Sequence, residues 1–307
     1  MAKKRSIKSQ FHYAITKNFK EGVKKRDYKI ENGQAMDNKI FSYQELYRLK
    51  DVARDINNFL RENEIERRDV RDIKAEDINK FLESKKYDCT QQTINSYKNS
   101  IYKLQEVVNK TYKLDIKWRE DINIPSSLKS IKSKNRGVKG VISDGDYKKI
   151  IEYAEKNKCQ SAYAIILEKE LGVRVNEIVN IKKENINLDK KTIKFENTKG
   201  GKEITKKIKN INLVKEILDK NYSSNFLFSI KGSSINRYLN RVQDKLRLER
   251  NSFHNLRRNY AQNFYIIKLK KGLSEEKALL ETSKQLNHRT KREKLMEESY
   301  IKRKNIR

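Results

Sequence analysis

The sequence predicts a mainly α-helical protein with a small β-hairpin or sheet, divided into two domains joined by a linker. Apolar residues recur at helical spacing through most of the chain and alternate as in strands at one place. The single proline, Pro125, lies among serines, glycines and lysines, which is typical of a linker. A chain of 307 residues is long enough for two cores. We expect a basic arm over 1–40, a helical domain over 41–120, a linker over 121–140 and a second domain over 141–307.

The first domain is expected to contain three helices. Residues 1–40 are basic and poorly periodic, so we expect them to form an arm rather than part of the core. The segments FSYQELYRLKDVARDINNFLRENEI, IKAEDINKFLESKK and CTQQTINSYKNSIYKLQEVVNKTY each place apolar residues on one helical face. Thr90 or Thr93 is expected to cap the third helix. With lysines on their outer faces, these helices indicate a small basic domain that ends near Trp118.

The second domain is expected to open with two helices followed by a hairpin. SDGDYKKIIEYAEKN starts a helix at Ser143, and SAYAIILEKELGV is typical of a more buried one. In KTIKFENTKGGKEITKKIKNI, apolar residues alternate on both sides of the glycine pair, at Ile193, Phe195, Ile204 and Ile208. This pattern predicts two strands joined at Gly200–Gly201.

The charge of the chain indicates a polyanionic partner. Lys and Arg number 72 against 41 Asp and Glu, for a formal net charge of +31. An AT-rich genome would enrich lysine, but it would enrich glutamate as well, so it explains the lysine count better than the imbalance. Nucleic acid is the leading partner, because no apolar run approaches the roughly 18 residues of a membrane-spanning helix. Cys89 and Cys159 lack metal-ligand spacing, so we expect no disulfide, no zinc and a cytoplasmic location.

Two pairs of residues at helical spacing are candidates for binding a phosphoryl group. His254 and Arg257 lie three apart, and together they offer a proton carrier beside a permanent cation. The alternative is a surface arginine with a hydrogen-bonded histidine at a helix start. Arg174 and Glu177 are also three apart, with valines and isoleucines around them. They form either a surface salt bridge or a partly buried arginine that a carboxylate aims at an anion.

Further candidates lie in the hairpin and near the C-terminus. Lys199 and Lys202 flank the glycine pair, where they either solubilise a turn or bring an ammonium group to a phosphate. His288 and Tyr300 lie among basic residues. Tyr300 either anchors a last helix by its ring or acts as a nucleophile. As a nucleophile it needs nearby cations, because the pKa of a free phenol is about 10.

Taken in order along the chain, these candidates resemble the active-site succession of the tyrosine recombinases, the phage integrase family. LGVRVNEIVNIKKENINL is similar to the family's Gly-x-Arg-x-x-Glu segment, and NTKGGKE is similar to its catalytic-lysine hairpin. FHNLRRNYAQNF resembles the His-x-x-Arg box, and LNH resembles the Leu-Gly-His before the nucleophile. The resemblance extends over residues 141–303, and TQQTINSYKNSIYKL more weakly resembles the family's core-binding domain. It implies the catalytic residues Arg174, Lys199, His254, Arg257, His288 and Tyr300, with Glu177 in support.

The resemblance implies a helical, SAM-like core-binding domain followed by a tyrosine-recombinase catalytic domain. Such a protein is a site-specific DNA recombinase that uses a 3′-phosphotyrosyl intermediate to integrate or excise a mobile element, without cofactor or metal. Its implied partners are double-stranded DNA at specific attachment or core sites, three further copies of the chain on synapsed DNA, and DNA-bending accessory proteins. In solution a monomer is expected. It would act in the bacterial cytoplasm or nucleoid, or be phage-encoded.

Other classes of function share some of these features. A type IB topoisomerase uses nearly the same chemistry on one strand, and a non-catalytic DNA-binding protein shares the charge and the helices. A metal nuclease is disfavoured, because no carboxylates or histidines lie at ligand spacing. Two departures from the family remain. The spacing from His288 to Tyr300 is longer than usual, and only IKRKNIR follows Tyr300, which leaves little chain to dock onto a neighbouring copy.

Overall fold

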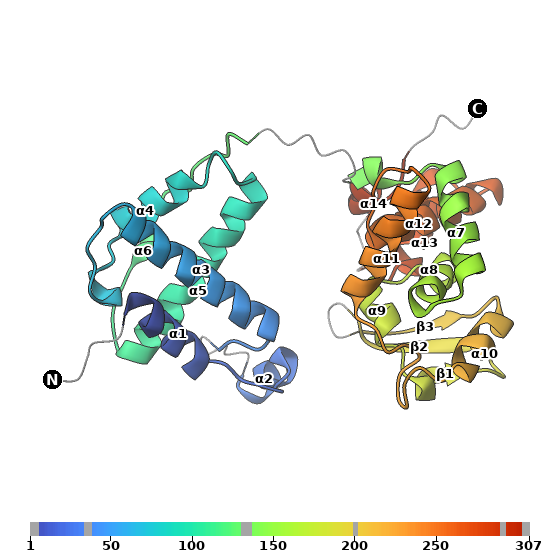
Figure 1. Ribbon diagram of the computed structural model, residues 1–307, viewed down its shortest axis with the longest axis horizontal. Coiled ribbons are helices and arrows are strands. Elements are labelled where there is room, and N and C mark those ends of the chain that lie inside the picture. Colours follow the sequence, from blue (N-terminus) through green and yellow to red (C-terminus); the bar gives the residue numbers. More distant parts are fainter. Residues whose placement is uncertain (1–5, 34–38, 130–136, 199–201, 289–292, 303–307) are drawn as a thin grey trace. The chain divides into compact units, whose positions relative to one another are not determined.

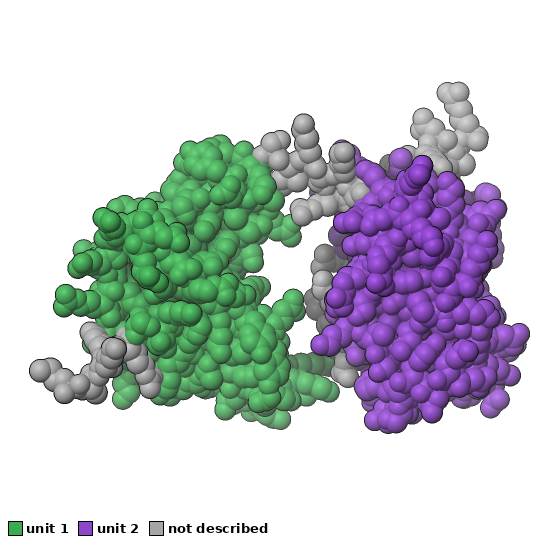
Figure 2. Space-filling model, viewed as in Figure 1, with its two compact units in different colours: residues 1–132 green, residues 133–307 purple. Residues whose placement is uncertain are grey.

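The computed structural model describes residues 6–33, 39–129, 137–198, 202–288 and 293–302. Helices dominate, and the chain separates into two compact units, Met1–Lys132 and Ser133–Arg307 (Figures 1 and 2). The boundary between the units falls inside residues 121–140. Among the described residues, no helix combines the length and the apolar content needed to cross a membrane.

Unit 1 is a small helical domain. Its helices are α1 (Ile7–Lys17), α2 (Lys25–Glu31), α3 (Tyr43–Glu62), α4 (Ala75–Ser84), α5 (Gln91–Tyr112) and α6 (Trp118–Asp121), with a 3-10 turn, η1, at Val70–Asp72. The three expected helices correspond to α3, α4 and α5. Thr90 caps α5 as expected, because its Oγ1 accepts the backbone N–H of Thr93 at 3.2 Å.

The N-terminal stretch differs from the expected basic arm. Residues 7–17 form α1, which packs against α3 and α5 and buries Ile7, Phe11, Ala14 and Ile15 in the core of unit 1. These residues recur at helical spacing, and Ser6 caps the helix by accepting the N–H of Ser9. The apolar face of α1 therefore makes this helix part of the core of unit 1, although basic residues surround it in the sequence.

The expected linker is also shorter than residues 121–140. Ile122 is buried in unit 1, and Ile124 packs against its core. The backbone N–H groups of Asn123 and Ser127 donate to Asn79 and Gln91, both at 2.8 Å. The start of this stretch therefore belongs to unit 1.

Unit 2 surrounds a buried helix and carries a three-stranded antiparallel sheet in the order β1-β2-β3. Helix α8 packs against α7, α11 and α12, and residues 162–168 are buried on all its sides. The strands pair Phe195 with Ile204, which agrees with the alternation in the sequence. Ser143 begins α7 as expected by accepting the N–H of Asp146 at 3.2 Å.

The elements of unit 2 have the following bounds. They are η2 (Gly137–Gly140), α7 (Asp144–Asn157), α8 (Gln160–Leu171), α9 (Val175–Val179), η3 (Lys183–Asn185), β1 (Ile186–Asn187), β2 (Thr192–Thr198), β3 (Lys202–Lys207), α10 (Ile211–Asp219), α11 (Gly232–Lys245), α12 (Phe253–Lys270), α13 (Glu275–Gln285) and α14 (Glu293–Ser299).

Candidate active site

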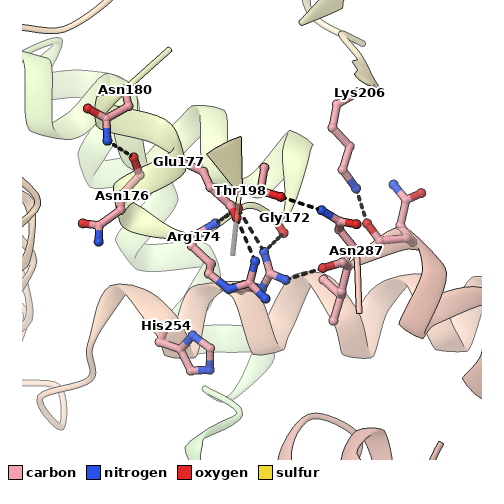
Figure 3. A network of polar contacts seen from close by, with 12 residues as sticks. Gly172, Arg174, Asn176, Glu177, Asn180, Thr198, Lys206, His254 and Asn287 are labelled. Atoms are coloured by element: carbon pink, nitrogen blue, oxygen red, sulfur yellow. Dashed lines mark hydrogen bonds and ion pairs between the residues drawn. The ribbon is translucent and has the colours of Figure 1, made fainter. Parts of the chain in front are cut away.

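Side chains from the start of α9, from α12 and from the residues that follow α13 and α14 meet in unit 2. Ion pairs, a hydrogen bond and ring contacts bring together six residues that the sequence predicts for the site: Arg174, Glu177, His254, Arg257, His288 and Tyr300. Lys199, with Gly200 and Gly201, lies outside the described residues. Figure 3 shows Arg174, Glu177 and His254 converging with residues of the hairpin and of the turn after α13.

Glu177 fixes Arg174 at the start of α9. Arg174 is the N-cap residue, and its backbone N–H donates to Oε2 of Glu177 at 2.7 Å. Its Nη1 donates to Oε1 of the same carboxylate, also at 2.7 Å. A carboxylate in the first turn satisfies an unpaired N–H and interacts favourably with the helix dipole. The pair is partly buried, so Arg174 is held in one orientation rather than swinging freely at the surface.

Arg257 is buried beneath this pair, with 1 % of its surface exposed. Its Nη1 donates to the carbonyl of Gly172 at 2.8 Å, and its Nη2 donates to the carbonyl of Leu286 at 2.6 Å. Nη1 also lies 3.6 Å from Oε2 of Glu177. Burial lowers the pKa of Arg257 below its ordinary value, although the nearby Tyr300 and Glu177 partly oppose this shift. The expected alternative of a surface arginine at this position is therefore wrong.

Tyr300 lies between two histidines at the end of α14. Its ring meets the rings of His254 and His288 edge-on, with centroids 5.6 and 5.3 Å apart. The phenol oxygen is 3.4 Å from Nε2 of His254. This is longer than a strong O–H···N bond, as is common for catalytic pairs without substrate. The ring is buried and the His254 side chain is exposed, so His254 lies on the open side of the nucleophile candidate.

The hairpin is fastened to the turn that carries His288. Nδ2 of Asn287 donates to Oγ1 of Thr198 at 3.0 Å, and Nζ of Lys206 donates to the carbonyl of Gln285. A cation at the C-terminal end of α13 interacts favourably with the helix dipole. Lys206 is buried, and burial, together with the nearby charge of Arg257, lowers its pKa to about 8.

Two buried titratable residues near the site were absent from the sequence candidates. The burial of Lys206 could have been predicted from the sequence, because Ile204, Lys206 and Ile208 occupy alternate positions on the inward face of β3. No pattern in the sequence indicates that Glu168 is buried, because α8 is buried around its whole circumference and has no single apolar face on which to place it. Neither carboxylate oxygen of Glu168 has a hydrogen-bond partner among the described residues, and burial raises its pKa well above the ordinary value.

The site combines two guanidinium groups, two histidines, a carboxylate and a phenol. Within the described parts of the chain, no three His, Cys, Asp or Glu residues are grouped so that they could hold a metal ion. Two guanidinium groups, one of them buried, suit the oxygens of a phosphate, and the phenol between two imidazoles suits proton transfer.

Comparisons with known proteins identify a similar family and several similar folds. Residues 141–268 match the sequence model of the phage integrase family. XerH recombinase in a pre-cleavage complex with its difH substrate has the same fold at a TM-score of 0.61 and 16% identity, over 97% of this chain and 92% of that one. A lambda integrase tetramer on a Holliday junction has a TM-score of 0.55 and 16% identity, over 88% of this chain and 75% of that one. The Tn1549 transposon integrase has a TM-score of 0.51 and 13% identity, over 93% of this chain and 96% of that one. No curated protein matches the sequence.

Proposed function

We propose that the chain is a member of the phage integrase family, whose sequence model matches residues 141–268, and that it is a site-specific DNA recombinase with Tyr300 as its nucleophile. One observation supports the proposal above all. The Tyr300 phenol lies 3.4 Å from His254 and close to Arg257, which shares the carboxylate of Glu177 with Arg174. The proposed nucleophile, its proposed base and two cations suited to a phosphate therefore lie within one unit.

Tyr300 attacks a DNA phosphodiester. A bond forms between the phenol oxygen and phosphorus, and the bond from phosphorus to the 5′ oxygen breaks. The products are a 3′-phosphotyrosine and a free 5′-hydroxyl. His254 takes the proton of the phenol, and Lys199 donates a proton to the departing 5′ oxygen.

The remaining residues stabilise the charge on the pentacoordinate phosphate. Arg174 and Arg257 bind its non-bridging oxygens, and His288 donates to one of them. Glu177 keeps both arginines in place. Because the phosphotyrosine retains the energy of the broken bond, a second 5′-hydroxyl rejoins the strand without ATP or a metal ion.

Both units bind the duplex, and four copies of the chain exchange strands between two specific sites. Lambda integrase forms such a tetramer on a Holliday junction, and XerH has been captured on DNA before and after cleavage. The chain is a monomer before it meets DNA, acts in the bacterial cytoplasm or nucleoid, and integrates or excises a mobile element with DNA-bending accessory proteins.

A suicide-substrate assay tests this function. Nicked duplexes tiled across the DNA that flanks the gene are incubated with the full chain, with and without EDTA. We expect a covalent protein–DNA adduct that is unaffected by EDTA and absent in Tyr300→Phe. Tyr265→Phe, which alters a buried tyrosine of the same apolar cluster, is the matched control and keeps the adduct.

Three results would contradict the proposal. Adducts that persist in Tyr300→Phe would assign the nucleophile elsewhere, and loss of adducts in EDTA would overturn the metal-free chemistry. Relaxation of supercoiled DNA without any defined site would indicate a type IB topoisomerase activity instead.

A further inference from the structure

We propose that Arg258 and Gln262 are positioning residues that hold the main chain on both sides of Tyr300 and thereby set where its phenol oxygen lies. The proposal rests on the function proposed above. With His254, these residues form a row at every fourth position of α12, and such residues share one face of a helix. His254 meets the phenol, Arg258 meets the residue before Tyr300, and Gln262 meets Lys302.

Arg258 binds the backbone just before the tyrosine. Its Nε donates to the carbonyl of Ser299 at 2.9 Å, and its Nη1 donates to Oδ1 of the buried Asn255 at 2.8 Å. Burial lowers the pKa of this half-buried guanidinium below its ordinary value, although the nearby Tyr300 partly opposes this shift. Both hydrogen bonds end on neutral oxygens, and the second one fixes the guanidinium plane from its own helix. The hydrogen bond to Asn255 therefore holds the Arg258 side chain in the orientation in which it donates to the carbonyl of Ser299.

Gln262 binds the backbone just after the tyrosine, using both ends of its amide. The N–H of Lys302 donates to its Oε1 at 2.7 Å, and its Nε2 donates to the carbonyl of Lys302 at 3.1 Å. The Gln262 side chain is itself buried. A two-point bond of this kind fixes both the position and the direction of a peptide segment.

The segment around Tyr300 needs such support. Helix α14 is only 7 residues long, and a helix this short has little stability of its own. After it, the N–H groups of Tyr300 and Ile301 both return to the carbonyl of Met296, at 2.9 and 2.8 Å. Apolar contacts of Met296 and Ile301 hold the segment in the core, but they do not fix its position along α12. The directional bonds from Arg258 and Gln262 supply that register.

Displacing a reacting group by about 1 Å can slow a reaction by about 10²-fold. In single-turnover cleavage of the nicked duplex at saturating protein, we expect Arg258→Met and Gln262→Ala each to be about 10–100-fold slower. DNA affinity should remain within about twofold, since neither side chain touches the DNA in the proposed mechanism. Arg258→Lys, which can still donate to the Ser299 carbonyl, should recover much of the rate.

Two variants that lose similar bonds away from Tyr300 serve as matched controls. Arg250→Met removes an exposed pair with Asp244, and Gln160→Ala removes a bond to the N–H of Ser229. Both should cleave at the wild-type rate. Wild-type rates in Arg258→Met and Gln262→Ala would overturn the inference, as would a parallel loss of rate, affinity and melting temperature that Arg258→Lys does not relieve. Absence of any wild-type adduct would instead refute the proposed function.

Discussion

Gly172→Ala tests the close packing on which the buried arginine depends. Gly172 ends α8 at a φ of +60°, and its carbonyl accepts Nη1 of Arg257. A Cβ atom there would lie 2.2 Å from Cδ1 and 2.3 Å from Cε1 of Tyr260. Ordinary contact between carbons is about 3.5–4.0 Å, so the ring or the backbone must move by more than 1 Å.

The expected cost has two parts. A left-handed conformation costs an alanine about 1–2 kcal/mol, and overpacking costs about 1–3 kcal/mol. The free energy of unfolding should therefore fall by roughly 2–5 kcal/mol. For a unit of this size, that lowers the melting temperature by roughly 4–20 °C. The cleavage rate should fall as well, because the carbonyl that holds Arg257 moves with the backbone.

Circular dichroism melting of the full chain measures this loss, and Gly272→Ala is the matched control. Gly272 has a φ of +80°, but an added Cβ would meet nothing within 4 Å, so only the conformational strain applies. In a Tyr260→Ala background, the cost of Gly172→Ala should fall to that of the strain alone. Equal melting temperatures for Gly172→Ala and Gly272→Ala would refute the close approach of Tyr260.

Four further outcomes are expected. The logarithm of DNA affinity should fall linearly with that of salt, at about −0.9 per phosphate contact, and a flat dependence would contradict phosphate neutralisation. Between about pH 8 and 10.5 the wild-type free energy of unfolding should rise with pH, because Lys206 keeps its proton in the unfolded chain and has lost it in the folded one. Lys206→Met should remove this rise in urea titrations. Glu168→Met should remove a fall in stability above pH 4.5, where only the unfolded carboxyl ionises. Lys199→Ala should slow cleavage about 10²–10⁴-fold and be rescued by a bridging 5′ sulfur, whereas Lys202→Ala should be milder and not rescued.

Local patterns predicted much of the fold. The caps Thr90 and Ser143 and the pairing of Phe195 with Ile204 followed from spacing and side-chain chemistry. The packing of α1 was missed, because basic residues around Phe11 hid a short apolar stripe. Composition describes a whole segment, whereas burial depends on one face of it.

The site was predictable where function demands a particular side chain. Arg257 and Tyr300 could be chosen as candidates from the sequence, because the roles proposed for them, binding an anion and attacking a phosphate, restrict the residue type. Arg258 and Gln262 could not, because their bonds end on backbone atoms of Ser299 and Lys302, which carry no residue-specific signal. Lys206 was obscured because lysine is abundant throughout this chain and is usually exposed.

The single carboxylate shared by two guanidinium groups sets the charge balance of the site. Arg174, Arg257 and Glu177 together carry one net positive charge, which matches the single negative charge of a phosphodiester. In the proposed mechanism the pentacoordinate phosphate carries one negative charge more, so the charge of these three residues equals that of the substrate phosphate and falls one short of that of the transition state. Any further cation that reaches the phosphate is then used by the transition state rather than by the substrate. An uncharged methylphosphonate reverses the balance, because the same trio is mismatched to that substrate and matched to its transition state.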